Sequence, residues 1–130
     1  MISSVRLDGS TACMTIDGAT DTAVFQAYVR EVLCPSLRPG DQVIMDNLGP
    51  HKNEQTIALI AAAGASVRFL PAYSPDLNPI EMMWSKLKAL LRAAEARTAE
   101  ELQRAIAAAL QRISAQDAAH WFAACGYSII

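Results

Sequence analysis

The most constraining feature of this chain is an ordered succession of two short apolar runs with a helical pattern between them. The segment Gln42–His51 opens with the first apolar run, which is bounded by polar and turn residues and is typical of a strand buried on both faces. Asn53–Gly64 is rich in Ala, Ile and Leu and closes on glycine, so it predicts a helix. Val67–Leu70 predicts a second strand. Strand, helix and strand form a βαβ unit with parallel strands, so an α/β domain is expected.

Composition indicates a single domain. The chain has 130 residues, of which 52% are hydrophobic and 18% charged, and this suits one domain with a core of ordinary size. No apolar run approaches the length of a membrane span, and the amino end lacks the basic-then-apolar pattern of a signal peptide. The three cysteines form no C-x-x-C pair, so we expect free thiols. These features predict one cytoplasmic domain over residues 1–130.

Two acidic residues stand beside the predicted βαβ elements. Asp46 directly follows the first apolar run and therefore lies at the carboxyl end of a strand. Glu81 is expected at the third position of a helix, because Asn78 suits the N-cap and Pro79 the first helical position. Sites in open α/β sheets lie beyond the carboxyl ends of the parallel strands. We therefore expect the segment 71–78 to return Glu81 to the edge where Asp46 lies.

A pair of converging carboxylates suits a hard divalent cation. Mg²⁺ prefers oxygen ligands and commonly binds through one or two carboxylates together with phosphate oxygens of the substrate. The reaction class indicated is metal-assisted phosphoryl transfer. Each acid also has a structural alternative, since Asp46 suits a turn with Asn47 and Gly49, and Glu81 suits the third position of a capping box.

Two strings in the sequence are specific enough to indicate a family. MDNLGPHK and FLPAYSPDLNPIEMMWSKLK resemble the catalytic core of DDE transposases, in particular the bacterial insertion-sequence branch of the mariner superfamily. The resemblance is clearest from Val43 to Leu91. It implies a ribonuclease-H-like fold, with a mixed sheet flanked by helices, and three catalytic acids. In this branch 34 residues separate the last two acids, and 34 residues also lie between Asp46 and Glu81 here.

The resemblance implies a function as well as a fold. Asp46 matches the second acid of the family and Glu81 the third, and both are implied to hold Mg²⁺ (or Mn²⁺) ions. The implied activity is that of an endonuclease that cleaves DNA strands and transfers them during DNA transposition. The implied partners are transposon ends and target DNA, together with self-association or association with full-length transposase.

The amino end departs from the family pattern. The family's first acid lies on an early strand and follows a helix-turn-helix DNA-binding region, whereas only 45 residues precede Asp46. Those residues predict a hairpin formed by Ile2–Gly9 and Ala12–Gly18, and its acids Asp8 and Asp17 precede glycines, which is a common turn signal. The expectation is therefore a partial catalytic domain, incomplete at the amino end and inactive without upstream sequence.

Two other functions remain open. The first is a non-catalytic, truncated transposase that associates with full-length copies and regulates them. The second is an unrelated flavodoxin-like binding domain, which would need a phosphate-binding loop at a strand end, and the sequence offers none.

The helix expected after Pro79 carries two distinct faces. Its apolar face recurs at steps of three and four residues and is expected to pack on the sheet. That face consists of Ile80, Met83, Trp84, Leu87, Leu90 and Leu91. A polar stripe consists of Glu81, Ser85, Lys88 and Arg92. We predict that Lys88 and Arg92 bind DNA phosphates, and the alternative is an ordinary solvated face.

Three residues close to Asp46 in the sequence are further candidates. His51 is expected to orient substrate or assist proton transfer, although a histidine in a polar turn is often only a surface residue. Lys52 is expected to contact DNA at the same edge. Asn47 is expected to support the site by hydrogen bonding.

Three further helices are predicted, over Thr20–Leu33 after a start at Asp21, and from Thr98 and Ser114 onward.

Net charge limits how the chain could bind DNA. The formal charge is −2 and the sequence pI is about 5.6, which is unfavourable for a freestanding DNA binder because contacts to phosphates supply much of the affinity. DNA targeting is therefore expected to come from the missing amino-terminal region.

Overall fold

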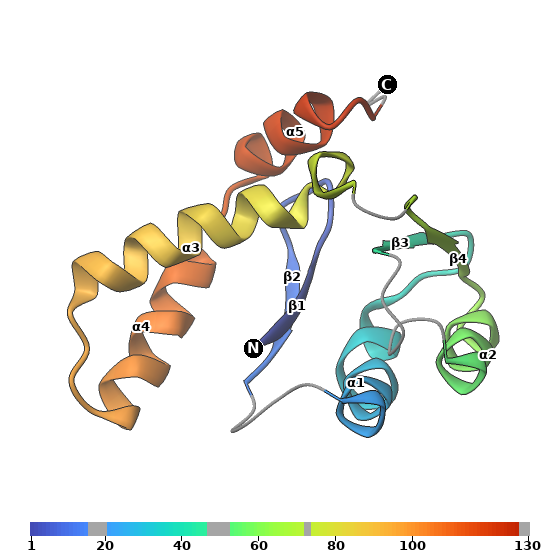
Figure 1. Cartoon of the computed structure of the whole chain (residues 1–130), viewed down its shortest axis with the longest axis horizontal. Helices are drawn as coiled ribbons and strands as arrows, with labels where there is room; N and C mark the ends of the chain where they lie inside the picture. The colour runs from blue at the N-terminus through green and yellow to red at the C-terminus, as the bar shows by residue number, and fades with distance from the viewer. Residues whose placement is uncertain (16–20, 47–52, 72–73, 128–130) are drawn as a thin grey trace. The chain divides into compact units, whose positions relative to one another are not determined.

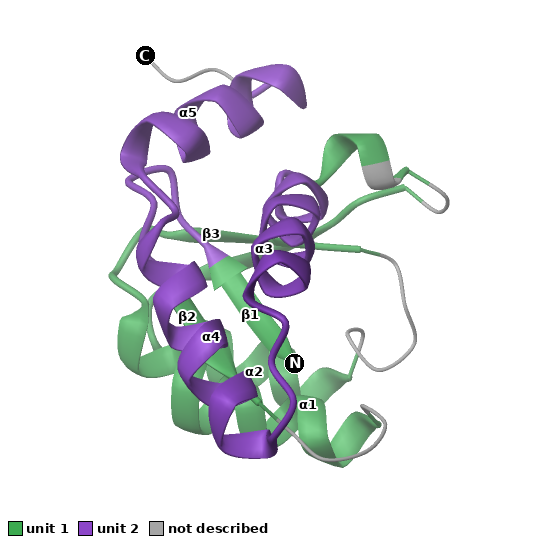
Figure 2. Cartoon of the chain, turned by 90° about the vertical axis from the view of Figure 1, so that its left-hand side faces the viewer, with its two compact units in different colours: residues 1–4, 12–78 green, residues 5–11, 79–130 purple. Residues whose placement is uncertain are grey.

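The computed structural model describes residues 1–15, 21–46, 53–71 and 74–127 (Figure 1). In chain order its strands and α-helices are β1 Ile2–Val5, β2 Thr11–Met14, α1 Thr22–Tyr28, β3 Gln42–Met45, α2 Glu54–Ala62, β4 Ser66–Phe69, α3 Ile80–Ala94, α4 Ala99–Gln111 and α5 Ala115–Ala124. They fall into two compact units (Figure 2). Unit 1 comprises residues 1–4 and 12–78, and unit 2 comprises residues 5–11 and 79–130.

The predicted βαβ unit is present in unit 1. Strands β3 and β4 pair in parallel, in a register that places Gln42 opposite Ser66 and Met45 opposite Phe69. The intervening helix α2 begins after Asn53, whose side chain accepts hydrogen bonds from two backbone amides of the first turn. The expected α/β class is therefore confirmed, with a helix one to two residues shorter at its ends than 53–64.

The mixed sheet flanked by helices that the resemblance implies is not confirmed. Within the described residues, β1 and β2 form one two-stranded sheet, and β3 and β4 form another. The expectation that the first apolar run is buried on both faces is wrong, since Gln42 is exposed and Val43 and Ile44 are only half-buried. A strand with a single hydrogen-bonded neighbour lacks the cover that a central strand receives.

The core of unit 1 lies where α1 and α2 pack together on one side of the β3–β4 pair (Figure 1). Helix α1 begins after Asp21, whose carboxylate accepts a hydrogen bond of 2.8 Å from the amide of Val24. The helical path continues as a π-helical turn over Val29–Leu33, so the predicted packing helix is confirmed. The buried core residues are Phe25, Tyr28, Val29, Leu33, Met45, Ile60 and Ala65.

A buried hydroxyl links this core to strand β2. The Tyr28 hydroxyl donates a hydrogen bond of 2.7 Å to the carbonyl oxygen of Ala12. Burial raises the pKa of Tyr28 to about 12, because the low-dielectric surroundings disfavour the phenolate. The hydroxyl therefore keeps its proton and remains a donor at neutral pH.

The predicted amino-terminal hairpin is confirmed by β1, β2 and the turn between them. The Asp8 carboxylate accepts hydrogen bonds from the amide and the hydroxyl of Ser10, at 2.9 and 2.6 Å. Gly9 adopts a φ of +89°, which favours glycine. Asp8 thus has the turn role that the sequence indicated, whereas Asp17 lies outside the described residues.

Unit 2 is built around the long amphipathic helix α3. Its buried cluster contains Met83 and Leu87 of α3, Ala109 of α4 and Trp121 of α5. Ile113, which lies between α4 and α5, completes it. Within unit 2 the apolar face of α3 packs mainly on helices, with Val5 of β1 also against the cluster. Helices α4 and α5 supply most of the apolar surface that this unit offers to α3. The expectation that this face packs on the β3–β4 sheet stays a prediction.

The starts of α4 and α5 follow the local sequence signals. The Thr98 hydroxyl accepts a hydrogen bond of 3.1 Å from the amide of Glu101, and Ser114 forms a capping box with Asp117. Both predicted helices are confirmed. None of the three cysteines, all of which are described, forms a disulfide. Among the described helices, none has the length and apolar character needed to cross a membrane.

Candidate functional site

Asp46 lies where the sequence placed it, directly after β3. The amide of Leu70 donates a hydrogen bond of 2.7 Å to the carbonyl oxygen of Met45, so the parallel pairing continues to the residue before the acid. Asp46 is half-buried at this position. It is therefore a carboxylate held by a strand end, at the edge where α/β proteins commonly place their sites.

Glu81 lies in the first turn of α3, one position earlier than expected. The helix begins at Ile80, and the carbonyl of Pro79 accepts hydrogen bonds from the amides of Met82 and Met83, at 3.1 and 3.3 Å. Pro79 rather than Asn78 is thus the capping residue, and Glu81 is the second helical residue instead of the third. Asn78 is buried instead, with 9% of its surface exposed.

The capping-box alternative for Glu81 does not fit this helix start. A capping box requires an acid at the third position that accepts a hydrogen bond from the amide of the N-cap residue. Pro79 has no amide hydrogen, and no side chain caps α3. The Glu81 side chain is exposed, and its carboxylate makes no hydrogen bond or ion pair with the described part of the chain. Its oxygens are therefore accessible to a ligand.

The two acids belong to different compact units, because the boundary between the units falls between Asn78 and Pro79. Asp46 is in unit 1 and Glu81 in unit 2. The segment that connects them includes a short 3₁₀ turn at Pro75–Leu77, in which the Leu77 amide bonds to the Ser74 carbonyl oxygen at 3.1 Å. The convergence of the two carboxylates on one ion stays a prediction.

Three of the candidate residues, Asn47, His51 and Lys52, lie outside the described residues. Their proposed roles at the Asp46 edge are untested. Within the ranges that the structure describes, no three His, Cys, Asp or Glu side chains are grouped so that they could hold a metal ion.

The polar stripe on α3 is exposed along its whole length. Its four residues Glu81, Ser85, Lys88 and Arg92 all face solvent. The hydroxyl of Ser85 donates a hydrogen bond of 3.2 Å to the carbonyl oxygen of Glu81. The side chains of Lys88 and Arg92 form no ion pair with the described residues, so both cations are available to an external anion.

Basic residues are concentrated in the unit that carries this stripe. Unit 2 contains seven of the eleven Lys and Arg residues but only six of the thirteen Asp and Glu residues. Unit 1 therefore accounts for the acidic balance of the whole chain. The overall charge of −2 conceals a more basic half, and the sequence reasoning from net charge alone missed this distribution.

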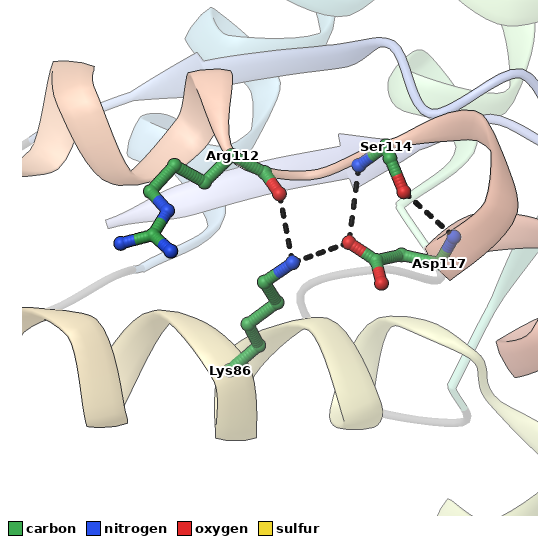
Figure 3. Close-up of polar contacts among 4 residues, drawn as sticks. All are labelled: Lys86, Arg112, Ser114 and Asp117. Carbon is green, nitrogen blue, oxygen red and sulfur yellow. Dashed lines mark hydrogen bonds and ion pairs between the residues drawn. The ribbon is translucent and has the colours of Figure 1, made fainter.

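Lys86 is a residue that the sequence analysis did not single out. Its ammonium group forms an ion pair with Asp117 of α5 and donates a hydrogen bond of 2.7 Å to the carbonyl oxygen of Arg112 (Figure 3). Asp117 also accepts a hydrogen bond of 3.1 Å from the amide of Ser114. The available signal was the position of Lys86 directly beside the apolar face of α3, from which a long side chain can reach a packed neighbour.

The bond from Lys86, and then the amide of Ser114, hold the pKa of the Asp117 carboxyl below its ordinary value. A carboxyl whose pKa is lowered on folding contributes stability above its unfolded pKa. That contribution disappears as the pH falls through the folded value. The ion pair of Lys86 and Asp117 is therefore intact at neutral pH.

A sequence model of a protein family matches most of the chain. The family is described as DDE superfamily endonuclease, and the match covers residues 1–103. This span contains Asp46 and Glu81 and ends within α4. No curated protein matches the chain.

Proposed function

The chain belongs to the DDE superfamily of endonucleases, and from this premise we propose that it is a transposase domain that cleaves and transfers DNA strands. The observation that carries the proposal is the placement of its two candidate acids. Asp46 ends a parallel strand and Glu81 opens a helix with an accessible carboxylate. The 34 intervening residues equal the spacing of the insertion-sequence branch that the motifs resemble. We propose that branch, and a ribonuclease-H-like fold, on the same grounds.

The donor set fits a hard divalent cation. Asp46 and Glu81 offer carboxylate oxygens, which are the ligands that Mg²⁺ and Mn²⁺ prefer, and the exposed Glu81 carboxylate has no partner among the described residues. Asp46 would hold the ion from the strand end and Glu81 from the first turn of α3. When bound, such ions supply activation of water or of a DNA 3′-hydroxyl and stabilisation of the leaving oxygen. The helix N-terminus beside Glu81 further favours an anionic phosphate nearby.

The family uses three acids, and the motifs assign only two of them to this chain. Asp8 is occupied in the hairpin turn by Ser10, which argues against its use as the third ligand. We therefore propose that the first acid comes from sequence outside residues 1–130, and that DNA targeting does so too. His51, Asn47 and Lys52 are proposed to support substrate at the Asp46 edge.

The role of Asp8 in the hairpin turn also favours a second candidate function. A chain that contributes only two acids could associate with active transposase and inhibit it, as a regulatory fragment. Adding the purified chain to an active transposase distinguishes the two functions. Inhibition that persists in an Asp46→Asn variant supports the regulatory function, because a catalytic contribution would require that carboxylate.

The first test of the proposed site measures metal binding rather than activity. Mn²⁺ is paramagnetic, so titrating it into the ¹⁵N-labelled chain should broaden the amide signals nearest Asp46 and Glu81 before all others. Glu81→Gln should abolish the broadening at the start of α3 because an amide side chain carries no charge for the ion. Broadening that is equal at every exposed acid would contradict a built site.

A further part of the proposal is that the exposed stripe on α3 binds the DNA backbone. Lys88 and Arg92 lie one and two further turns beyond Ser85 on the face that starts at Glu81, and both are exposed cations. A DNA strand whose scissile phosphate lies at the metal site would continue past these side chains. They would then neutralise two of its phosphates.

Replacing both Lys88 and Arg92 with Ala should weaken DNA binding. The slope of log affinity against log salt, which is negative, should also become shallower by about two, because each phosphate contact releases roughly one counterion. The matched control is Arg97→Ala with Arg104→Ala, which removes two exposed cations from the same unit but off the stripe. Fluorescence anisotropy of labelled DNA at several salt concentrations measures both quantities. Equal losses of DNA affinity in the two double variants would mean that net charge, and not the position of Lys88 and Arg92, causes the effect.

A further inference from the structure

We propose that Lys86 is a positioning residue for Glu81: its contacts to the α4–α5 junction fix helix α3, and thereby set where α3 presents its carboxylate. This inference rests on the proposed role of Glu81 as a metal ligand. It adds a residue from outside the acidic motif, and that residue acts through the helix rather than by touching the ion.

No described residue fixes the Glu81 side chain. This side chain is exposed and makes no hydrogen bond or ion pair with the described residues. Its position within unit 2 is therefore inherited from the backbone of α3. Any rotation or sliding of α3 against its neighbours moves the carboxylate by the same amount.

The apolar packing of α3 is poorly directional. The buried side chains of α3 are Met83, which is fully buried, and Leu87, with 1% of its surface exposed. Hydrophobic attraction has no preferred direction, and methionine adapts readily to alternative packings. These contacts hold α3 onto α4 and α5 without specifying a single rotation of the helix.

Lys86, which directly precedes Leu87 on α3, supplies directional contacts. Its ammonium group lies between two acceptors from different elements, the Arg112 carbonyl at the end of α4 and the Asp117 carboxylate in the first turn of α5 (Figure 3). Both charges also suit their helix ends, since a cation is favoured at a C-terminus and an anion at an N-terminus. About two thirds of each side chain is shielded from solvent.

The anchor for Lys86 is itself rigid. Asp117 belongs to the capping box with Ser114, so its carboxylate cannot turn freely. Gly9 of the hairpin turn packs against the backbone of Ser114, and a Cβ added at Gly9 would come within 2.7 Å of the Ser114 carbonyl carbon. The junction of α4 and α5 is therefore held from the side of the hairpin as well.

Geometry separates the roles of Lys86 and Glu81 on one helix. Five residues along an α-helix correspond to a rise of about 7.5 Å and a rotation of about 140° from one side chain to the other. Lys86 thus contacts the α4–α5 junction while Glu81 faces solvent. One helix can therefore be fixed on one side and present a ligand on the other.

The test is a double-mutant cycle between Lys86→Met and Glu81→Gln, with the Mn²⁺ dissociation constant as the readout. Methionine keeps much of the apolar stem of lysine and removes the ammonium group. Lys86→Met should weaken Mn²⁺ binding about tenfold, the lower end of the effect seen for groups that orient metal ligands. In the Glu81→Gln background the same substitution should have no further effect, because the carboxylate that Lys86 positions is already absent.

Rescue and control variants separate positioning from loss of folding. Lys86→Arg should keep most of the Mn²⁺ affinity, since arginine can also reach both acceptors. Asp117→Asn should weaken Mn²⁺ binding as Lys86→Met does, because the amide cannot form the ion pair. Arg104→Met, which removes an exposed cation elsewhere in unit 2, should change nothing. All variants are compared at a temperature where tryptophan fluorescence reports them fully folded.

The outcomes distinguish the inference from the function beneath it. If Glu81→Gln leaves Mn²⁺ binding unchanged, the proposed metal role is wrong and the inference falls with it. If Glu81→Gln weakens binding but Lys86→Met does not, the metal role stands and the positioning role of Lys86 is overturned. Additive losses in the double variant would also overturn it.

Discussion

Glu81→Gln and Asp46→Asn are each expected to lower metal-dependent DNA strand cleavage and strand transfer by roughly a thousandfold. A metal ion stabilises transition-state charge by several kcal/mol, and each 1.36 kcal/mol corresponds to a factor of ten in rate. Each substitution keeps the shape of the side chain and removes the charged oxygen donor. The measurement is single-turnover cleavage and joining of labelled transposon-end DNA by active transposase that contains this chain.

Glu100 provides a closely matched control for Glu81. Both glutamates are exposed second residues of a helix, so replacing either with Gln should lose the same small interaction with the helix dipole, about 0.3–1 kcal/mol. Asp76, exposed in the turn before α3, serves likewise for Asp46. Glu100→Gln and Asp76→Asn should retain near-normal activity. Full activity in Glu81→Gln or Asp46→Asn would refute the catalytic assignment of that residue.

Leu87→Ala is expected to destabilise unit 2 by roughly 2–5 kcal/mol. Leu87 has 1% of its surface exposed and packs in the cluster formed by α3, α4 and α5. Truncation removes buried apolar area and leaves a cavity that the neighbouring helices fill only in part. Because natural domains are stable by only about 5–15 kcal/mol, this is a large share of the total.

Tryptophan fluorescence is a suitable probe for this experiment, because both tryptophans, Trp84 and Trp121, belong to unit 2. Urea unfolding followed by this signal gives the change in free energy. The same substitution at Leu102, which has 44% of its surface exposed, should cost less than about 0.5 kcal/mol. If Leu87→Ala and Leu102→Ala gave equal effects, the burial of the α3 face would be contradicted.

Much of unit 1 was predictable because its signals are local. The order of strand, helix and strand, the cap at Asn53 and the helix end before Gly64 each depend on residues within a few positions of one another. The starts of α4 and α5 at Thr98 and Ser114 follow for the same reason. The single-residue error at the start of α3 is the usual uncertainty of helix boundaries.

The family was also accessible from the sequence, through motifs rather than through periodicity. The strings around Asp46 and Glu81 carried the resemblance, and the match to the DDE superfamily of endonucleases over residues 1–103 confirms it at the level of the superfamily. The exposure of Lys88 and Arg92 followed from the helical period of α3. Neither signal carried information about how α3 is held.

By itself the sequence determined the local elements, their order and the family motif of this chain. Only the tertiary structure decided which surface covers the apolar face of α3 and which partner Lys86 takes. The burial pattern of a helix shows that one face needs cover, but α4, α5 and a sheet would each satisfy that need. Lys86 and Asp117 are 31 residues apart, and their pairing exists only because the helices that carry them pack together.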